Sequence, residues 1–157
     1  MRRKDREIKD INELLHIIDQ CKVCRIAMQD EAGLYIVPMN FGYSYENKQL
    51  TLYFHSAKEG RKIEALKANS DICFEMDCGH KLITGDMACN YSYSYKSIIG
   101  YGQVSFVDDL EEKKHALTVL MKHQTGQDFE FNEKMISKVC VFKITVTEFT
   151  GKEANHR

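Results

Sequence analysis

Residues 139–149 read VCVFKITVTEF, and apolar and polar side chains alternate along this stretch. A period of two places one set of side chains on each face of a β-strand. Strand character recurs in five earlier segments, which are residues 23–29, 34–43, 50–54, 72–76 and 91–107. Turns or short helices join most of these segments, without a regular alternation of strand and helix. The sequence therefore predicts a mainly β fold with six strands in an antiparallel sheet or barrel.

Three helices are expected to flank these strands. Apolar residues spaced three and four apart predict a helix over residues 5–20. Ser56 and Glu59 match the capping box S-x-x-E, which predicts a short helix capped by Ser56. A third helix follows an aspartate cap at 108–109 and ends at Gly126.

Composition narrows the classes of protein to consider. The chain has 157 residues, of which 43% are hydrophobic and 29% charged, and its net charge is −1. These values are typical of a single folded domain, expected here over residues 1–157. The balanced charge argues against nucleic-acid binding, and no apolar run approaches the roughly 20 residues of a membrane span. The basic N-terminus lacks the apolar segment of a secretory signal, so a cytoplasmic protein without membrane contact is expected.

The six cysteines form no regular metal or disulfide pattern. Cys21 and Cys24 make a C-x-x-C pair, but no second pair has the spacing of a zinc site. The pair also falls where a helix gives way to a strand, whereas a thioredoxin-like pair opens a helix. Free buried thiols and no metal site are therefore predicted.

Residues 55–62, HSAKEGRK, concentrate cations where a helix is expected to begin. Lys58, Arg61 and Lys62 would lie beside the partial positive charge of the helix N-terminus, which is unfavourable for cations. A bound anion would resolve this conflict, because free N–H groups, the Ser56 hydroxyl and the cations converge there. A phosphate site is therefore predicted, and a solvated basic helix end is the alternative.

Two further features are candidate ligand contacts. Pro38 cannot donate to a β-ladder, so its strand is expected to be an edge strand or bulged, and Asn40 offers a donor and an acceptor nearby. Tyr91, Tyr93 and Tyr95 would share one face of the long strand, where an aromatic stripe can stack on a planar ring. For Tyr91 and Tyr93, packing within the fold is the favoured role.

Several stretches together resemble one family, namely MRRKDREI, YIVPMNFGY, LYFHSAKEGRK, YKSIIGYGQV and the terminal KITVTEFTGKE. In order and spacing they are similar to the Nim-type nitroimidazole-resistance proteins, in the FMN-binding split-barrel group related to pyridoxamine 5′-phosphate oxidase. The resemblance covers nearly the whole chain. It implies a six-stranded antiparallel split β-barrel with flanking helices, and a homodimer with two flavin sites at the subunit interface.

The resemblance also implies roles for individual residues. The flavin phosphate would be bound by Ser56, Arg61 and Lys62. The isoalloxazine ring would be lined by Val37, Pro38, Met39 and Asn40, and faced from the long strand by Tyr95 and Ser97. His55 is more typical of a structural residue when considered alone, but it matches the family histidine near the ring, where it would contact substrate or donate a proton.

The implied function is a flavin-dependent oxidoreductase that reduces nitroimidazoles or other small (hetero)aromatic compounds. FMN is the expected cofactor, with FAD as the other option, and an electron donor such as a reduced nicotinamide is required. Residues 151–157 look too short for the basic tail of the vitamin-making oxidases, so pyridoxamine phosphate is not the expected substrate. Two alternatives stay open: a flavin carrier or sensor without turnover, and a haem-binding split barrel with His55, His80 or His123 as axial ligand.

Overall fold

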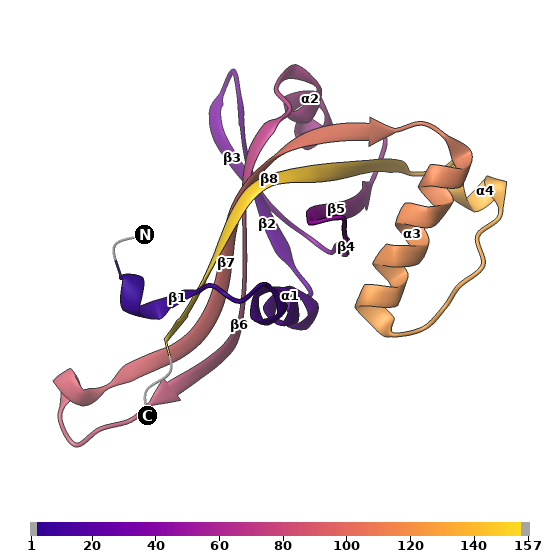
Figure 1. The fold of residues 1–157 in the computed structure, drawn as a ribbon. Coiled ribbons are helices and arrows are strands. Elements are labelled where there is room, and N and C mark those ends of the chain that lie inside the picture. The colour runs from indigo at the N-terminus through magenta and orange to yellow at the C-terminus, as the bar shows by residue number, and fades with distance from the viewer. Residues whose placement is uncertain (1–2, 155–157) are drawn as a thin grey trace.

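The computed structural model describes residues 3–154, so Arg2 of the basic N-terminal stretch and residues 155–157 of the short C-terminal segment lie outside it. These residues form one eight-stranded antiparallel sheet (Figure 1). The strand order is β3-β2-β6-β7-β8-β5-β4, and β1 pairs with β8. The strands are β1 (Glu7–Ile8), β2 (Cys24–Asp30), β3 (Gly33–Met39), β4 (Gly42–Glu46), β5 (Gln49–Ser56), β6 (Asp71–Ile83), β7 (Ser92–Val107) and β8 (Cys140–Ala154).

Helices flank this sheet. They are α1 (Ile11–Gln20), α2 (Arg61–Ala68), α3 (Leu110–Thr125) and the short α4 (Glu133–Ile136), with 3₁₀ turns η1 (Lys4–Arg6) and η2 (Ala88–Asn90). α1 packs on β6 and β7, α2 on β2, and α3 chiefly on β4 and β5. Over the described range, no helix has the length and apolar character needed to cross a membrane.

The expected fold class, an antiparallel split barrel with flanking helices, is confirmed. The number of strands differs from six for two local reasons. The expected strand 34–43 is interrupted at residues 40–41 and becomes β3 and β4, while Glu7 and Ile8 form the additional β1. β4 and β5 make a hairpin whose turn residues, Asn47 and Lys48, have φ of 51° and 65°. Positive φ at both turn positions suits a tight two-residue hairpin.

The start of α1 corrects the helix expected from residue 5. The Asp10 side chain accepts hydrogen bonds from the backbone N–H of Asn12 at 2.7 Å and of Glu13 at 3.4 Å, so the helix begins at Ile11. Ile8, which fits the helical spacing, instead pairs with Gly151 in the β1–β8 ladder. A contact with a residue distant in sequence therefore overrides the local periodicity.

The loop expected over residues 79–90 also begins later. β6 continues to Ile83, past an irregularity between Cys78 and Lys81 in its pairing with β7. Gly79 lies at this irregularity with φ of 69°, a value that glycine adopts readily. The β6–β7 hairpin consequently extends well beyond the body of the sheet (Figure 1).

The ends of α3 match the sequence expectation. The Asp109 carboxylate accepts a hydrogen bond from the backbone N–H of Glu112 at 2.9 Å. Gly126 follows the last turn in the left-handed region, with φ of 73°. α3 rests directly on β4, because a Cβ on Gly42 would lie 2.4 Å from Leu120 Cα. This close approach fixes the position of α3 over the sheet.

The interior of the barrel is filled by aromatic and aliphatic side chains. Phe41, Phe54, Phe74 and Phe142 are each at most 1% exposed, and the Phe54 and Phe142 rings stack with centroids 5.2 Å apart. Gly100 lets β7 pass close to Phe74, since a Cβ there would lie 2.4 Å from that ring. The six cysteines are all free, as expected, but only Cys21 and Cys24 are buried, and Cys89 is exposed.

Candidate functional site

The cationic segment after β5 differs locally from the sequence expectation. Ser56 does not cap α2; it is the last residue of β5, and its hydroxyl donates to the Ala57 carbonyl at 2.7 Å. The helix begins at Arg61, and Gly60 occupies the N-cap position with φ of 129°. The conformation available to glycine, rather than a side-chain cap, therefore sets where α2 starts. Arg61 and Lys62 become its first two residues, and Lys58 lies outside the helix.

Arg61 is held in place by the β2–β3 hairpin. Its guanidinium donates to the Asp30 carboxylate through Nε at 2.6 Å and through Nη2 at 3.1 Å. The same group lies over the Tyr35 ring, 4.3 Å from its centroid. The hydrogen bonds with Asp30 raise the pKa of Arg61 and lower the pKa of Asp30. Nη1 makes no hydrogen bond within residues 3–154, so this nitrogen can still bind an anion.

The start of α2 also offers backbone donors. Ile63 and Glu64 supply the first N–H groups that bond within the helix, both to the Gly60 carbonyl, at 2.9 and 3.2 Å. The N–H groups of Arg61 and Lys62 precede them and are free of intrahelical acceptors. The half-buried Lys62 side chain forms no ion pair in the described part of the chain. Cations and free N–H groups therefore gather at one helix end, as an anion site requires.

His55 projects from β5 beside this end of α2. Its side chain is only partly covered and stays open to solvent, while its backbone pairs with Val141 of β8. Partial burial of the ring lowers the pKa of His55, and the positive charge of Lys62 lowers it further. The neutral imidazole is favoured, so the ring can accept a hydrogen bond as well as donate one.

The segment 37–40 ends the edge strand β3, which confirms the edge position expected from Pro38. Pro38 is exposed and lies opposite Arg25 of β2, whereas Met39 is buried. The Asn40 amide nitrogen donates to the Lys22 carbonyl at 2.9 Å and to Gln124 Oε1 at 3.2 Å. The donor side of Asn40 is therefore already used to join β3 to α3.

Tyr95 and Ser97 lie far from the start of α2. Val107, at the end of β7, pairs with Val141, which in turn pairs with His55. From Ser97 to Val107 the strand covers about 30 Å at the usual rise per residue. The Lys152 ammonium lies 5.8 Å from the centroid of the Tyr95 ring, and a hydrogen bond with Lys152 lowers the pKa of Tyr95. Within one chain, the implied cofactor residues thus form two separate groups.

The tyrosines that precede this group do not pack into the fold. Tyr91 and Tyr93 are 50% and 51% exposed, so the packing role expected for them is wrong for this chain. Their neighbours Leu82 and Met87 on the same hairpin are exposed as well. The extended β6–β7 hairpin therefore presents apolar side chains to the outside.

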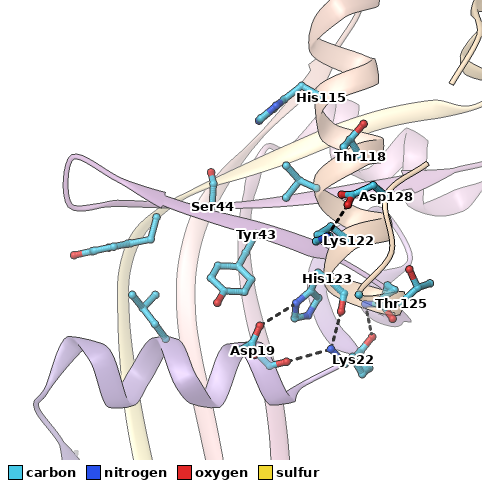
Figure 2. A pocket seen from close by; sticks show the side chains of 15 residues that line it. Asp19, Lys22, Tyr43, Ser44, His115, Thr118, Lys122, His123, Thr125 and Asp128 are labelled. Atoms are coloured by element: carbon cyan, nitrogen blue, oxygen red, sulfur yellow. Dashed lines mark hydrogen bonds and ion pairs between the residues drawn. The ribbon is translucent and has the colours of Figure 1, made fainter. Parts of the chain in front are cut away.

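The other histidines considered as haem ligands occupy different places. His123 lies near the end of α3 (Figure 2). Its side chain is only 3% exposed, and its Nε2 lies 2.8 Å from the Cys21 carbonyl oxygen. His80 lies on β6 and its Nε2 is 2.7 Å from the Asp77 carboxylate. No cluster of three metal-ligating side chains occurs between residues 3 and 154.

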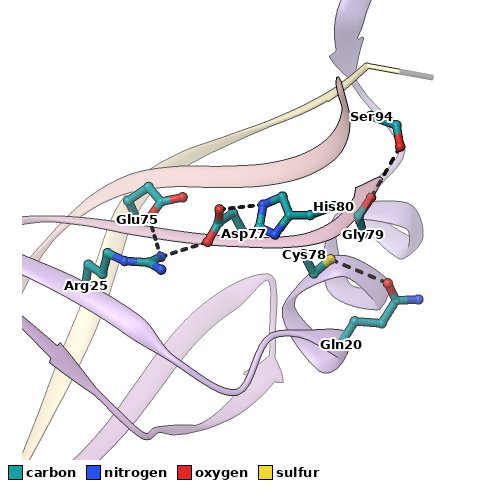
Figure 3. Close-up of polar contacts among 8 residues, drawn as sticks. All are labelled: Gln20, Arg25, Glu75, Asp77, Cys78, Gly79, His80 and Ser94. Atoms are coloured by element: carbon teal, nitrogen blue, oxygen red, sulfur yellow. Dashed lines mark hydrogen bonds and ion pairs between the residues drawn. The ribbon is translucent and has the colours of Figure 1, made fainter. Parts of the chain in front are cut away.

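A polar network beside Ser97 was not identified from the sequence. Arg25 Nη1 donates to Glu75 at 3.0 Å and to Asp77 at 2.7 Å, and Asp77 also contacts His80 (Figure 3). Burial raises the pKa of Glu75, and the charge of Asp77 raises it further. Asp77 lies directly opposite Ser97 in the β6–β7 ladder. The sequence shows Glu75 and Asp77 two residues apart, but it does not show that both contact Arg25 on the neighbouring strand β2.

Comparison with known proteins identifies a family and several solved structures that this chain resembles. The sequence profile described as pyridoxamine 5′-phosphate oxidase matches residues 10–153. No match is found among curated proteins. A solved structure of a candidate 5-nitroimidazole antibiotic resistance protein from Bacteroides thetaiotaomicron is 40% identical, with 94% of this chain and 86% of that chain covered and a TM-score of 0.81.

More distant structures share the fold. A flavocytochrome from Azotobacter vinelandii is 18% identical, covering 99% of this chain and 72% of that one, with a TM-score of 0.80. An FAD-binding protein from Mesorhizobium loti is 24% identical, covering 94% and 96% of the two chains, with a TM-score of 0.64. At these identities the likeness concerns the arrangement of strands and helices.

Proposed function

Because the chain belongs to the pyridoxamine 5′-phosphate oxidase family, we propose that it binds a flavin and uses it to reduce small aromatic compounds. Nitroimidazoles are the proposed substrates, in line with the resistance assigned to the 40% identical Bacteroides protein. When bound, the flavin supplies the electron chemistry, and the protein supplies binding, orientation and proton transfer. A reduced nicotinamide is the proposed electron donor.

The start of α2 is the observation that carries this proposal. A flavin mononucleotide ends in a phosphate, and here the residues present fit such a group. Arg61 keeps Nη1 available while Asp30 holds the rest of the guanidinium, and Lys62 is a cation without an ion-pair partner among the described residues. Two free backbone N–H groups point along the same helix end. FMN is preferred over FAD because a terminal phosphate can use both cations at once.

His55 is proposed to face the reacting end of the substrate. It leaves β5 just before the phosphate-binding segment, and its pKa is lowered, so at neutral pH it holds a neutral ring. Such a ring can hold a substrate by hydrogen bonding and can relay a proton from solvent to the reduced group. The residues 37–39 at the exposed end of β3 are proposed to line the flavin ring.

A second copy of the chain is proposed to complete the site. Tyr95 and Ser97 can join the α2 group only from another subunit, since about 30 Å of strand separates them within one chain. The outer face of the sheet offers a surface for this contact. Ile36, Ala27, Cys73 and Tyr101 lie in one row across β3, β2, β6 and β7, with Ile36 62% and Tyr101 49% exposed. Exposed apolar side chains in adjacent strands are typical of a subunit interface.

The cofactor is tested by titrating FMN into purified protein and following its absorbance and fluorescence. Lys62→Gln should weaken FMN binding at least fivefold, because one charge-assisted contact to phosphate is lost. Lys67→Gln is the matched control, since Lys67 lies at the other end of α2 and should leave binding unchanged. Equal affinity in both variants, or no binding of FMN at all, would refute the phosphate site. A haem spectrum in the purified protein would favour the haem-binding alternative.

The composite site is tested by mixing variants. Lys62→Gln and Ser97→Asp should each weaken FMN binding alone. After subunit exchange, each mixed dimer would carry one doubly altered site and one intact site, so part of the high-affinity binding should return. A mixture that stays as weak as its components, or a monomer in light scattering, would contradict the proposal. Turnover is tested separately by nicotinamide oxidation with a nitroimidazole as acceptor; FMN binding without turnover would identify a carrier or sensor.

A further inference from the structure

A cavity lies between α1, β4 and α3, and we call it the α1–α3 groove (Figure 2). It has a volume of about 1040 Å³, enough for a drug-sized organic molecule. Its walls include the aromatic side chains of Tyr43, Tyr45, His115 and His123. None of the residues assigned to the flavin lines it. The groove is therefore a separate feature of the fold, and what it binds does not depend on the proposed flavin.

His123 leaves one buried nitrogen without a partner. A backbone carbonyl can only accept, so the 2.8 Å contact between Nε2 and the Cys21 carbonyl requires that Nε2 carries the proton. In the neutral ring Nδ1 is then an acceptor, and it is buried with no hydrogen-bond partner in the described structure. A buried polar atom left unpaired is destabilising, so a donor at this position would be stabilising.

The polar groups around Nδ1 do not supply that donor. The nearest is Asp19 Oδ1 at 3.7 Å, which is a second acceptor. The Lys22 ammonium lies close by, but it donates to two backbone carbonyls, those of Asp19 at 3.2 Å and His123 at 2.7 Å. The Asp19 side chain, 64% exposed, therefore forms no ion pair with a lysine or arginine in the described chain. With His123 neutral, Nδ1 and Asp19 Oδ1 are thus two acceptors 3.7 Å apart at the wall of the groove, and neither has a hydrogen-bond donor among the described residues.

Aromatic rings flank these two acceptors. The Tyr43 ring meets the His123 ring edge to face, with centroids 5.3 Å apart, and Tyr45 lies further along β4. Burial raises the pKa of Tyr43, and the nearby charge of Asp19 raises it further. Tyrosine faces attract cations as well as planar groups.

We propose that the α1–α3 groove binds a small planar organic cation, such as an amidine or a protonated amino-heterocycle. Its N–H groups donate to His123 Nδ1 and the Asp19 carboxylate, and its ring lies against Tyr43. A cation satisfies both acceptors and neutralises Asp19, whereas an anion or an apolar molecule does neither. A metal ion is less suitable, because these two side chains alone do not make a set of three ligands.

Benzamidine is a suitable probe, and benzamide is its neutral control of nearly the same shape. Binding is measured on the full-length protein by titration, following amide and histidine ring nitrogen signals in NMR spectra. Benzamidine should bind at least tenfold more tightly than benzamide and should shift the His123 Nδ1 signal. Equal binding of the two compounds, or shifts confined to other histidines, would overturn the proposal, as would a groove that holds water only.

Two variants test whether binding depends on the groove itself or only on the overall charge of α1. Asp19→Asn should abolish the preference for benzamidine, weakening its binding about tenfold, while the amide keeps the size of the side chain. Glu13→Gln removes the same charge from the same helix, outside the groove, and should change affinity less than twofold. An equal loss in both variants would show that only the overall charge of α1 matters. Zn²⁺ serves as a further probe, and competition with benzamidine at stoichiometric Zn²⁺ would favour a metal site instead.

Discussion

Gly42→Ala should destabilise the protein through a direct collision between β4 and α3. The added Cβ would lie 2.4 Å from Leu120 Cα, 2.5 Å from Leu120 N and 2.8 Å from Val119 C. Ordinary carbon–carbon contacts are about 3.5–4.0 Å, so α3 must move away by roughly 1 Å. All three contacted atoms are backbone, which cannot rotate aside as a side chain would. The expected loss is about 2–3 kcal/mol of unfolding free energy, at the upper end for overpacking.

The measurement is urea unfolding of wild-type and variant protein, with thermal unfolding as a second readout. For a domain of this size the midpoint temperature should fall by roughly 4–12 °C. Gly126→Ala is the control: a Cβ there meets nothing within 4 Å, and only its φ of 73° is unfavourable. That control should lose about 1 kcal/mol. If Gly42→Ala were as stable as wild type, or no less stable than the control, the close approach of α3 to β4 would be incorrect.

Three further predictions follow from single groups. Burial lowers the pKa of His123, so as the pH falls the unfolded chain binds a proton at this residue before the folded protein does. Stability should therefore fall as the pH drops below about 6.5, and His123→Gln should reduce this pH dependence in thermal unfolding between pH 7.5 and 5.5. Asp10→Ala should cost about 1 kcal/mol in urea unfolding, since the α1 cap is lost, and an unchanged midpoint would contradict this. A thiol reagent should modify exposed Cys89 quickly but reach Cys21 and Cys24 only on unfolding, because burial raises their pKa; Cys89→Ser should remove the fast phase.

Local sequence signals predicted an element correctly where residues within or next to that element determine where it begins. Asp109 with Gly126 predicted both ends of α3, and the alternation around residues 139–149 predicted where β8 begins, although the strand continues to Ala154. These signals act within a few residues, so no distant contact is needed to interpret them. The expectation failed at residues 5–10, where pairing of Ile8 with Gly151 replaced the first helical turn. It failed again at Ser56, because the conformation of Gly60 set the start of α2.

Local sequence signals did not predict how the site residues are arranged in space. Arg61 and Lys62 were identified from their position in the sequence, but the contact of Arg61 with Asp30 joins residues that only the sheet brings together. The distance between Ser97 and the start of α2 depends on the length and register of β7 and β8. The unpaired nitrogen of His123 likewise depends on α1, β4 and α3 meeting around one ring.

The two hydrogen bonds of Lys22 have a consequence for how the molecule unfolds. The Lys22 ammonium donates to the carbonyls of Asp19, in the last turn of α1, and His123, in the last turn of α3. These two residues are far apart in the sequence. Opening either helix end deprives the other of a shared donor, so the two should fray together rather than independently. In hydrogen-exchange terms, the amides at these two helix ends would belong to one cooperative opening unit, closed by a single side chain.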